Sequence, residues 1–169
     1  MEKGKIIFLT GISSAGKTTL ARALQGKLQE HYYWLSLDTF TDDMAPERHK
    51  ETNWPDIYRQ SRDLFNHSIQ LFSDKGVNVI VDRVLVGIEE DCINMLRDYP
   101  VLFVHVTCKS ISELRRREAE RGDRDIGQGE SQLAHLSPYI VFDCIVDTSE
   151  NTTDECANKI ISLLDDIRI

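Results

Sequence analysis

The sequence lacks the features that mark several classes of protein. Its four cysteines form no C-x-x-C pair, so neither a zinc site nor a thioredoxin-like site is expected. No apolar run approaches the ~18 residues that a membrane-spanning helix needs. Basic residues are not in excess, since the formal net charge is −8, and broad nucleic-acid binding needs a basic footprint. These absences predict a protein that binds neither membranes nor nucleic acid.

The remaining composition is that of an ordinary globular protein. With 169 residues the chain is expected to form one domain, residues 1–169, large enough to bury a core without disulfides or structural metals. The cysteines stand far apart, mostly among apolar residues, and are expected to be buried, reduced thiols. The N-terminal residues run straight into a strand-like segment and are too short for a signal peptide. We therefore expect a cytoplasmic protein.

Apolar strand-like runs alternate with amphipathic helical runs along the chain. This pattern predicts an α/β domain whose parallel sheet is covered by helices on both faces. A loop is expected from residue 38 to about residue 53, and a mobile, glycine-containing loop from residue 122 to 129. The helix after Pro55 is expected to bury Ile57, Leu64, Phe65, Leu71 and Phe72 on one face. The strands are expected at residues 6–9, 33–37, 77–81, 101–106 and 141–146.

Residues 11–18 carry the strongest motif of the sequence, G-x-x-x-x-G-K-[ST]. A strand-like run precedes it and an amphipathic helical run follows, as a phosphate-binding loop requires. The glycines permit backbone angles that let successive N–H groups face one concavity, and the helix start adds its positive dipole end. Lys17 supplies a cation to the β- and γ-phosphates, and the Thr18 hydroxyl can ligand Mg²⁺. ATP binding is therefore assigned to Gly11, Ile12, Ser13, Ser14, Ala15, Gly16, Lys17, Thr18 and Thr19.

Two aspartates are expected at the same edge of the sheet as this loop, beyond the carboxyl ends of the strands. Asp38 closes the second strand-like run, where a carboxylate near the γ-phosphate can accept the proton of an attacking hydroxyl; a turn or helix cap is the alternative. Asp82 ends the third run and fits a residue that orients Mg²⁺ together with Thr18; a simple turn residue is the alternative. Arg83 follows it and is expected either to contact the substrate or to pair with one of the two aspartates.

A run of arginines lies between residues 115 and 124. Such a run is often a solvated helix face that carries i,i+4 pairs. Arg117, Arg121 and Arg124, however, recur at spacings of four and three and lead into the glycine-containing loop. Residues 115–130 are therefore expected to form a lid that brings cations onto the phosphates and excludes water. Arg121 and Arg124 are assigned to the phosphates, and Arg117 to stacking on adenine.

Asp147 and Thr148 follow the fifth strand-like run, in a loop expected near the base of the nucleotide. They can contact adenine, mostly through the backbone, or they can cap the last helix. We include both among the ATP-binding residues, and the second interpretation stays open.

Taken together, these blocks resemble the chloramphenicol phosphotransferase-like kinases. The similarity rests on residues 11–17, 35–38, 79–87, 117–124 and 142–148, which keep the family's order and rough spacing over nearly the whole chain. It implies a P-loop NTPase three-layer sandwich, with a five-stranded parallel sheet in the order 2-3-1-4-5, helices on both faces and a lid. It also implies ATP as the phosphate donor, Mg²⁺ as the metal, and a hydroxyl of a small molecule as the acceptor.

The resemblance further implies roles for single residues. Asp38 matches the family's proposed general base, while Lys17 and Arg124 match its phosphate-stabilising cations. Arg83 departs from the pattern, because the chloramphenicol enzyme has an acidic residue at that point. The acceptor side of the site is expected to include Asp38, Phe40, Trp54 and Arg83.

Residues 42–54 should help to form the acceptor pocket. They are polar and little like those of the drug enzyme, whereas a nitrophenyl drug favours an apolar, aromatic-lined site. The expected function is ATP-dependent phosphorylation of a small-molecule hydroxyl, similar to that of a chloramphenicol 3-O-phosphotransferase, with antibiotic resistance as one role it would serve. A nucleoside, metabolite or nucleotide-sugar kinase of the same fold is the first alternative. An ATP-binding switch protein that hydrolyses ATP slowly is the second, and the sequence favours neither a monomer nor an oligomer.

Overall fold

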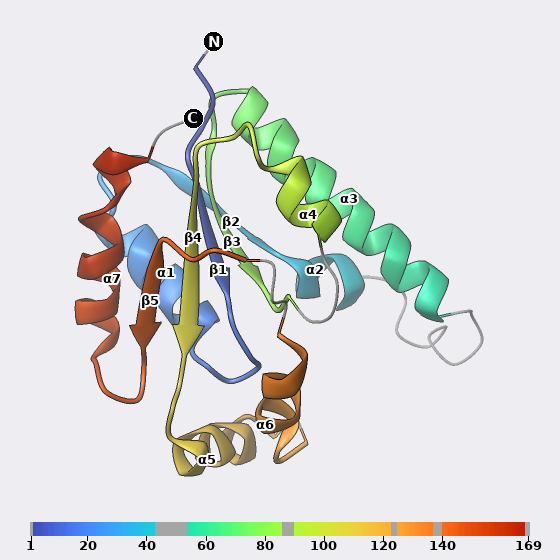
Figure 1. Ribbon diagram of the computed structural model, residues 1–169, viewed down its shortest axis with the longest axis vertical. Coiled ribbons are helices and arrows are strands. Elements are labelled where there is room, and N and C mark those ends of the chain that lie inside the picture. The colour runs from blue at the N-terminus through green and yellow to red at the C-terminus, as the bar shows by residue number, and fades with distance from the viewer. Residues whose placement is uncertain (1, 43–53, 86–89, 123–124, 137–139, 168–169) are drawn as a thin grey trace.

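A five-stranded parallel sheet forms the centre of the protein, as seen in a computed structural model that describes residues 2–42, 54–85, 90–122, 125–136 and 140–167 (Figure 1). All structural statements below concern these residues. The strands lie in the order β2-β3-β1-β4-β5, and every neighbouring pair is parallel. The predicted sheet and strand order are therefore confirmed. The strand bounds are β1 Ile6–Thr10, β2 Tyr32–Ser36, β3 Asn78–Arg83, β4 Val101–Thr107 and β5 Cys144–Asp147.

Helices cover both faces of the sheet, which gives the predicted three layers (Figure 1). Helices α1 and α7 pack on one face, and α3 and α4 pack on the other. Helices α5 and α6 lie beyond the carboxyl ends of the strands. The helix bounds are α1 Lys17–Lys27, α2 Leu37–Asp42, α3 Trp54–Asp74, α4 Glu90–Met95, α5 Ile111–Arg121, α6 Gln128–Gln132 and α7 Thr153–Ile161, with short 3-10 turns η2 Leu133–His135 and η3 Leu164–Asp166.

Strand β1 shows why the core has two halves. Its side chains alternate between the faces of the sheet, as every strand requires. Ile7 and Leu9 join the cluster under α1 and α7, while Ile6 and Phe8 join the cluster under α3 and α4. All four are fully buried, and burying each contributes roughly 1.5–3 kcal/mol relative to exposure. Helices on both faces of the sheet thus explain why β1 is a continuous apolar run in which polar residues do not alternate.

The register of the strands brings three chain segments to one edge. Leu9 of β1 lies opposite Asp82 of β3, and Ser36 of β2 lies opposite the same residue. The residues that follow β1, β2 and β3 therefore leave the sheet at nearly the same level. In open parallel sheets this carboxyl edge is where ligands bind.

Helix α2 is a departure from the sequence-based expectation, which placed a loop from residue 38 onward. Residues 37–42 are helical, because Leu37 and Thr41 are buried one turn apart. The Thr41 hydroxyl also donates to the Asp38 carbonyl at 3.0 Å. Asp38 consequently stands in the first turn of a helix rather than at the end of a strand. The rest of the expected loop, residues 43–53, lies outside the described residues.

The predicted apolar face of α3 is wrong at two positions. Leu64 and Leu71 are 64% and 57% exposed, whereas Ser61 and Ser73 are buried. The reason is a close approach at the helix end: the Ser73 hydroxyl donates to the Gly4 carbonyl at 2.6 Å, and the Gly4 N–H donates to the Ser73 carbonyl at 2.8 Å. Small residues fit at this contact, so the buried face of α3 is turned away from Leu64 and Leu71.

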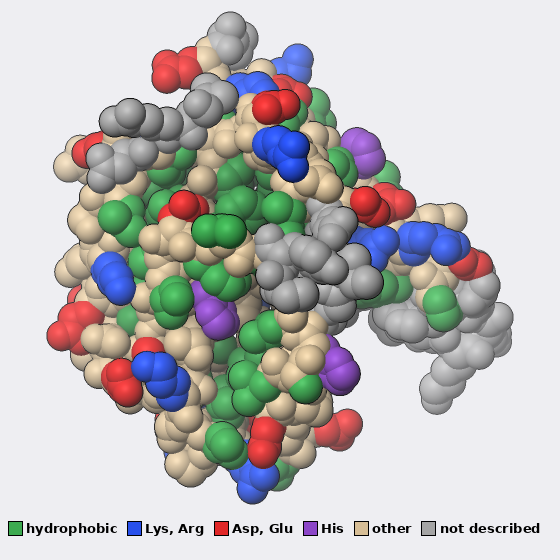
Figure 2. Space-filling model, viewed as in Figure 1, with side chains coloured by type: hydrophobic (Ala, Val, Ile, Leu, Met, Phe, Trp, Pro, Cys, Tyr) green, Lys and Arg blue, Asp and Glu red, His purple; other side chains and the backbone are tan. Residues whose placement is uncertain are grey.

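Several smaller expectations can be compared with the structure. Strand β5 begins at Cys144 rather than at residue 141, and Val141 is exposed. All four cysteines are buried and free, as predicted. A capping box of Thr152 and Glu155 is present at the start of α7. Among the described helices, none combines the length and the apolar character needed to cross a bilayer. Apolar side chains do show at the surface over α5 and α6 (Figure 2).

Two glycines provide a matched test of the packing before β1. A Cβ on Gly4 would lie 2.1 Å from the Val77 carbonyl oxygen, whereas a Cβ on Gly26 of α1 would meet nothing within 4 Å. Gly4→Ala is therefore expected to lower the free energy of unfolding by roughly 1–3 kcal/mol, the usual cost of overpacking. Gly26→Ala is expected to raise it by about 0.5–1 kcal/mol, since alanine favours a helix interior. Urea unfolding of both variants measures the difference, and equal effects would contradict the close approach at Gly4.

Candidate active site

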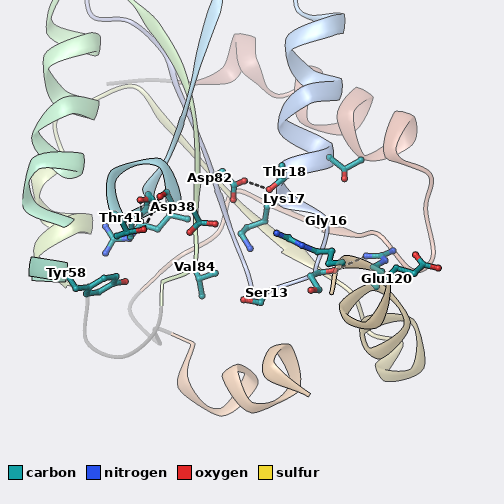
Figure 3. Close-up of a pocket in the computed structure, with 16 residues that line it drawn as sticks. Ser13, Gly16, Lys17, Thr18, Asp38, Thr41, Tyr58, Asp82, Val84 and Glu120 are labelled. Atoms are coloured by element: carbon teal, nitrogen blue, oxygen red, sulfur yellow. Dashed lines mark hydrogen bonds between the residues drawn. The ribbon is translucent and has the colours of Figure 1, made fainter. Parts of the chain in front are cut away.

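A cavity of about 360 Å³ opens at the carboxyl edge of the sheet. Three walls enclose it, each built by a different part of the chain (Figure 3). The first wall is the loop between β1 and α1 with the start of α1. The second consists of α2, the end of β3 and one residue of α3, and the third is the last part of α5.

The first wall adopts the conformation expected of a phosphate-binding loop. Gly16 is the N-cap of α1 at φ 98°, and no side chain caps the helix there. The first N–H groups of a helix have no intrahelical acceptor, and the residues that carry them line the cavity. Ser14 also has a positive φ, of 61°. Gly11 has a different reason to be glycine, because a Cβ there would lie 2.0 Å from the Val106 carbonyl oxygen of β4.

Lys17 is held inside this loop. Its Nζ donates to the carbonyl oxygens of Gly11 at 3.1 Å and Ile12 at 2.9 Å. Only 7% of the residue is exposed, yet it lines the cavity. A buried ammonium needs hydrogen-bond acceptors, and here they are loop carbonyls that a phosphate can replace. The loop thus places a cation where an anion would bind.

Thr18 and Asp82 join the first wall to the second. The Thr18 hydroxyl donates to Asp82 Oδ2 at 2.8 Å (Figure 3). Both residues line the cavity, and Asp82 is buried. A hydroxyl beside a carboxylate is a pair of oxygen ligands of the kind that Mg²⁺ takes together with water and phosphate oxygens. Within the described residues there is no group of three or more His, Cys, Asp or Glu side chains that could hold a metal ion by itself.

Asp38 stands on the second wall, across the cavity from Gly16 and α5 (Figure 3). Thr41 lies one turn later on α2, and Tyr58 of α3 borders the same space. Phe40, expected at the acceptor, is not brought into this lining. Its ring packs edge-on against Phe65, with centroids 5.4 Å apart, in the core below. The Trp54 side chain lies outside the described part of the structure.

Arg83 lines the cavity although only 2% of the residue is exposed. Its Nη1 donates to Asn66 Oδ1 at 2.7 Å and lies 3.6 Å from Cys92 Sγ. Asn66 belongs to α3 and Cys92 to α4, so the guanidinium is anchored from behind by two helices. The sequence had indicated this residue's proximity to the site but not its burial.

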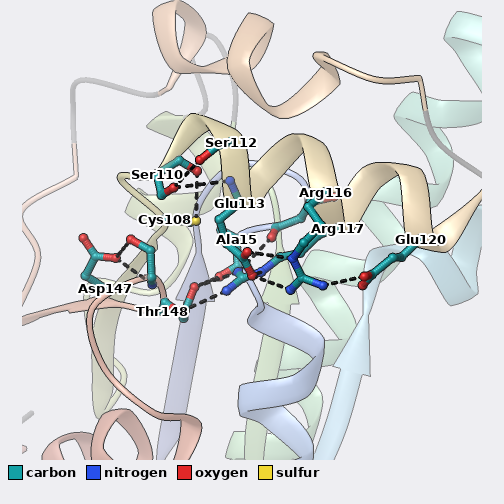
Figure 4. Close-up of polar contacts among 12 residues, drawn as sticks. Ala15, Cys108, Ser110, Ser112, Glu113, Arg116, Arg117, Glu120, Asp147 and Thr148 are labelled. Carbon is teal, nitrogen blue, oxygen red and sulfur yellow. Dashed lines mark hydrogen bonds and ion pairs between the residues drawn. The ribbon is translucent and has the colours of Figure 1, made fainter.

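The third wall holds Arg117 in a fixed position. Its guanidinium donates to the Ser14 carbonyl at 3.2 Å, to the Thr148 hydroxyl at 2.9 Å and to the Thr148 carbonyl at 3.0 Å (Figure 4). Its Nε donates to Glu113 at 2.8 Å. Arg121 follows one turn later and lines the cavity, and Arg124 lies outside the described residues. These contacts place Arg117 beside the loop, and its expected stacking on adenine stays a prediction.

Glu113 stabilises the position of Arg117. Hydrogen bonds from Arg116 and Arg117 lower the pKa of Glu113 from 4.5 to about 2. Since the pKa is depressed in the folded state, the pairing is complete above pH 4.5 and is lost only as the pH falls through about 2. Ser110 is the N-cap of α5, where the Glu113 carboxylate could complete a capping box by a return hydrogen bond. Ser110 does accept from the Glu113 N–H at 3.3 Å, but the Glu113 side chain turns to the two arginines instead.

Asp147 and Thr148 lie behind the loop rather than along the cavity. The Thr148 hydroxyl donates to the Ala15 carbonyl at 2.7 Å and accepts from Arg117. Asp147 Oδ1 accepts from the Ser149 N–H at 2.9 Å and from the Ser149 hydroxyl at 2.6 Å. The Asp147 carboxylate therefore holds a turn and does not cap the last helix, whose N-cap is Thr152, while the expected contact with adenine stays a prediction. Thr148 supports the nucleotide loop from below.

The chloramphenicol phosphotransferase-like protein family matches residues 4–165. The chain belongs to this family. A Mycobacterium tuberculosis H37Rv protein provisionally named an O-phosphotransferase is 32% identical, over 95% of this chain and 82% of its own length. Its counterpart in strain CDC 1551 gives the same figures. The chain is thus a phosphotransferase of this family.

Solved structures confirm the fold of this chloramphenicol phosphotransferase-like chain. APS kinase of M. tuberculosis, in complex with AMPPNP and APS, has a TM-score of 0.70 at 20% identity and covers 98% of this chain and 99% of its own. Shikimate kinase of Acinetobacter baumannii, in complex with shikimate, has a TM-score of 0.68 at 18% identity and covers 99% and 97%. At these identities the similarity establishes the P-loop kinase fold.

Sequence reasoning missed part of the cavity in this family member. Thr41, Tyr58, Val84 and Glu120 line it, and none was assigned to the site, although Val84 and Glu120 fall within the blocks that carry the family resemblance. Thr41 follows Asp38 by three residues, so a correctly predicted α2 would have placed both on one face. Tyr58 has no comparable signal, because its place depends on how α3 packs.

Thr148 offers a test of the support beneath the loop. Thr148→Val keeps the shape but removes the hydroxyl that bridges Ala15 and Arg117, and a buried hydrogen bond lost in this way costs roughly 1–3 kcal/mol. Thr107→Val at the end of β4 is the matched control, because the described contacts of Thr107 use its backbone carbonyl. Urea unfolding should show the larger loss for Thr148→Val, and equal stabilities would contradict the bridging role.

Proposed function

We propose that this chain transfers the γ-phosphate of ATP to a hydroxyl group of a small organic molecule, with Asp38 as the general base. The supporting observation is convergence: Lys17, the Thr18–Asp82 pair and Asp38 border one cavity, opposite the arginines of α5. A slow ATP-hydrolysing switch protein has no need of a carboxylate on the wall that faces the phosphates. Phosphoryl transfer to an acceptor needs that carboxylate, a cation and a closed space.

The triphosphate of ATP would lie along the first wall. The N–H groups around Gly16 and the first turn of α1 would receive the β-phosphate, and Lys17 would exchange its loop carbonyls for phosphate oxygens. Arg117 and Arg121 approach from the third wall, where they would neutralise charge on the transferred group. Arg124 is assigned to the same task by family resemblance. Residues 115–130 would thus act as the lid of the site.

Mg²⁺ fits the pair formed by Thr18 and Asp82. Both present oxygen atoms at 2.8 Å from each other beside the phosphate loop, and Mg²⁺ prefers few protein ligands combined with water and phosphate oxygens. When bound, the ion neutralises and orients the β- and γ-phosphates. Strand β3 holds Asp82 in the position that this role requires.

Transfer would proceed in line across the cavity. The acceptor hydroxyl oxygen forms a bond to the γ-phosphorus while the bond from that phosphorus to the β,γ-bridging oxygen breaks, and ADP leaves with the electron pair. The hydroxyl proton passes to the Asp38 carboxylate, which faces the loop from the second wall. Most of the rate enhancement would come from positioning and from the fixed cations.

The acceptor is proposed to be polar and hydroxylated. Asp38, Thr41 and Tyr58 supply hydrogen-bonding groups to the second wall, and Leu37 with Val84 supplies a small apolar area. A nitrophenyl ring would find little aromatic cover among these described residues, which favours a sugar-like or metabolite acceptor over chloramphenicol. The structural neighbours are named as kinases of different polar molecules, namely an APS kinase, a shikimate kinase and a gluconokinase of Sinorhizobium meliloti.

A panel of acceptors tests the proposed function directly. The protein is incubated with ATP and Mg²⁺ and with hydroxylated metabolites, nucleosides, nucleotide sugars and chloramphenicol, and products are analysed by mass spectrometry. One compound should gain the mass of one phosphate, with ADP formed in equal amount. ADP formed without any phosphorylated compound would support the switch protein instead.

Variants at Asp38 and Lys17 distinguish the loss of the general base from the loss of phosphate binding. Asp38→Asn removes the proton acceptor and is expected to lower kcat by about 10²- to 10⁴-fold while ATP binding is retained. Lys17→Met removes the cation and should weaken ATP binding as well as turnover. Asp98→Asn is the control, because Asp98 is exposed at the opposite end of the sheet. Calorimetric ATP binding and the rate of ADP formation are measured, and wild-type turnover in Asp38→Asn would remove Asp38 from this role.

A further inference from the structure

Glu118 is a buried charged residue that the mechanism above does not use. It is fully buried, although it stands in the arginine-rich part of α5, where an exposed ion pair was the alternative considered. Its two carboxylate oxygens accept separate hydrogen bonds, from the Gly127 N–H and from the Gly129 N–H, each at 2.7 Å. Gly127 and Gly129, which were expected to lie in a mobile loop, are therefore hydrogen-bonded to α5 at the start of α6.

Gly129 lies directly against the phosphate loop. A Cβ at this position would stand 2.7 Å from the Ser13 carbonyl oxygen and 3.2 Å from Glu118 Oε1. The residue is helical and does not have a positive φ, so its small size is required for the approach and not for the backbone conformation. Glu118 and Gly129 thus bring α6 into contact with the loop.

Gln132 completes this contact from the other end of α6. Its Oε1 accepts a hydrogen bond from the Ser13 N–H at 2.7 Å. On α5, Arg117 donates to the carbonyl of the next loop residue, Ser14, at 3.2 Å. Two neighbouring residues of the loop are consequently held by α5 and α6 together.

The loop needs such external contacts because of Ser14. This residue has φ 61°, a conformation that residues other than glycine seldom adopt and that persists only where the surroundings impose it. Residues at both sides of the peptide bond between Ser13 and Ser14 make the contacts just described. Removing those contacts should let the loop relax from the geometry in which its N–H groups converge.

We propose that Glu118 and Gln132 are positioning residues, which hold the phosphate loop in its anion-binding conformation before the nucleotide arrives. Glu118 fixes the start of α6, and Gln132 then restrains the Ser13 N–H. The proposal rests on the proposed function for its ligand, ATP. It differs from that proposal in concerning the loop's conformation and not the transferred group.

The experiment compares matched variants by two measurements. Hydrogen exchange at the Ser13 amide is followed by NMR in the nucleotide-free protein, and binding of a non-hydrolysable ATP analogue is measured by calorimetry. Gln132→Met removes the acceptor while keeping the length, and Gln132→Glu keeps the acceptor. Glu118→Gln replaces one of two acceptor oxygens by a donor. Gly129→Ala separates α6 from the loop, with Gly26→Ala as its control in an open helical position.

Gln132→Met, Glu118→Gln and Gly129→Ala are each expected to speed exchange at Ser13 and to weaken analogue binding by about five- to tenfold, the effect of one lost hydrogen bond. Gln132→Glu should retain slow exchange, and Gly26→Ala should match the wild type in both measurements. The combination of Glu118→Gln with Gln132→Met should be no weaker than Gln132→Met alone, since Glu118 acts through Gln132.

Unchanged Ser13 exchange in Gln132→Met and Gly129→Ala, or analogue binding equal to the wild type in both, would overturn the proposal. Gln132→Met covers the case in which Glu118→Gln does not fold. A wild-type protein that binds the analogue but phosphorylates no acceptor contradicts the proposed function alone, because the exchange comparison still decides the role of Glu118 and Gln132.

Discussion

Backbone hydrogen bonds between β1 and β3 hold Leu9 beside Asp82, and this pairing sets the level at which the phosphate loop and the Asp82 carboxylate leave the sheet. The hydrogen bond from Thr18 to Asp82 can form only because both strands end together. Strand β2 extends the same register, so that α2 begins at Leu37, directly after Ser36, and Asp38 follows as its second residue. Main-chain pairing thus spaces the chemical groups across the cavity.

Charge is distributed unevenly in this acidic protein. The net charge is −8, yet Lys17, Arg117 and Arg121 gather around the loop at one end of the sheet. Lys17 is kept in the loop by carbonyl oxygens, and Arg117 by Glu113 and Thr148. Side chains that are already oriented lose little freedom when an anion binds, and their surroundings shield them from water. A local cationic wall is therefore compatible with an acidic surface.

The sequence was most informative where a local pattern determines the structure. The phosphate loop and the alternation of strands and helices needed only short-range spacing, and the family resemblance supplied the strand order. It failed where a distant contact decides the outcome. The buried face of α3 depends on Ser73 meeting Gly4, and α2 depends on burial of Leu37 against the sheet.

The same limit applies to the site. Lys17, Asp38, Asp82 and Arg83 border one cavity, as their positions after strands indicated. Tyr58 and Glu118 carried no local signal, because a single residue does not show which way a packed helix faces. Phe40 fitted the pattern of a pocket residue, but its ring packs against the ring of Phe65 in the core.

The close approach of Gly11 to Val106 ties together two parts of the enzyme that are remote in sequence. The carbonyl of Val106 lies where any side chain at position 11 would need to be, and β4 leads within a few residues into α5. The position of α5, which carries the arginines, is therefore fixed relative to Gly11, the first glycine of the loop. Movement of α5 relative to the loop is resisted at this backbone contact, in addition to the hydrogen bond from Arg117 to the Ser14 carbonyl.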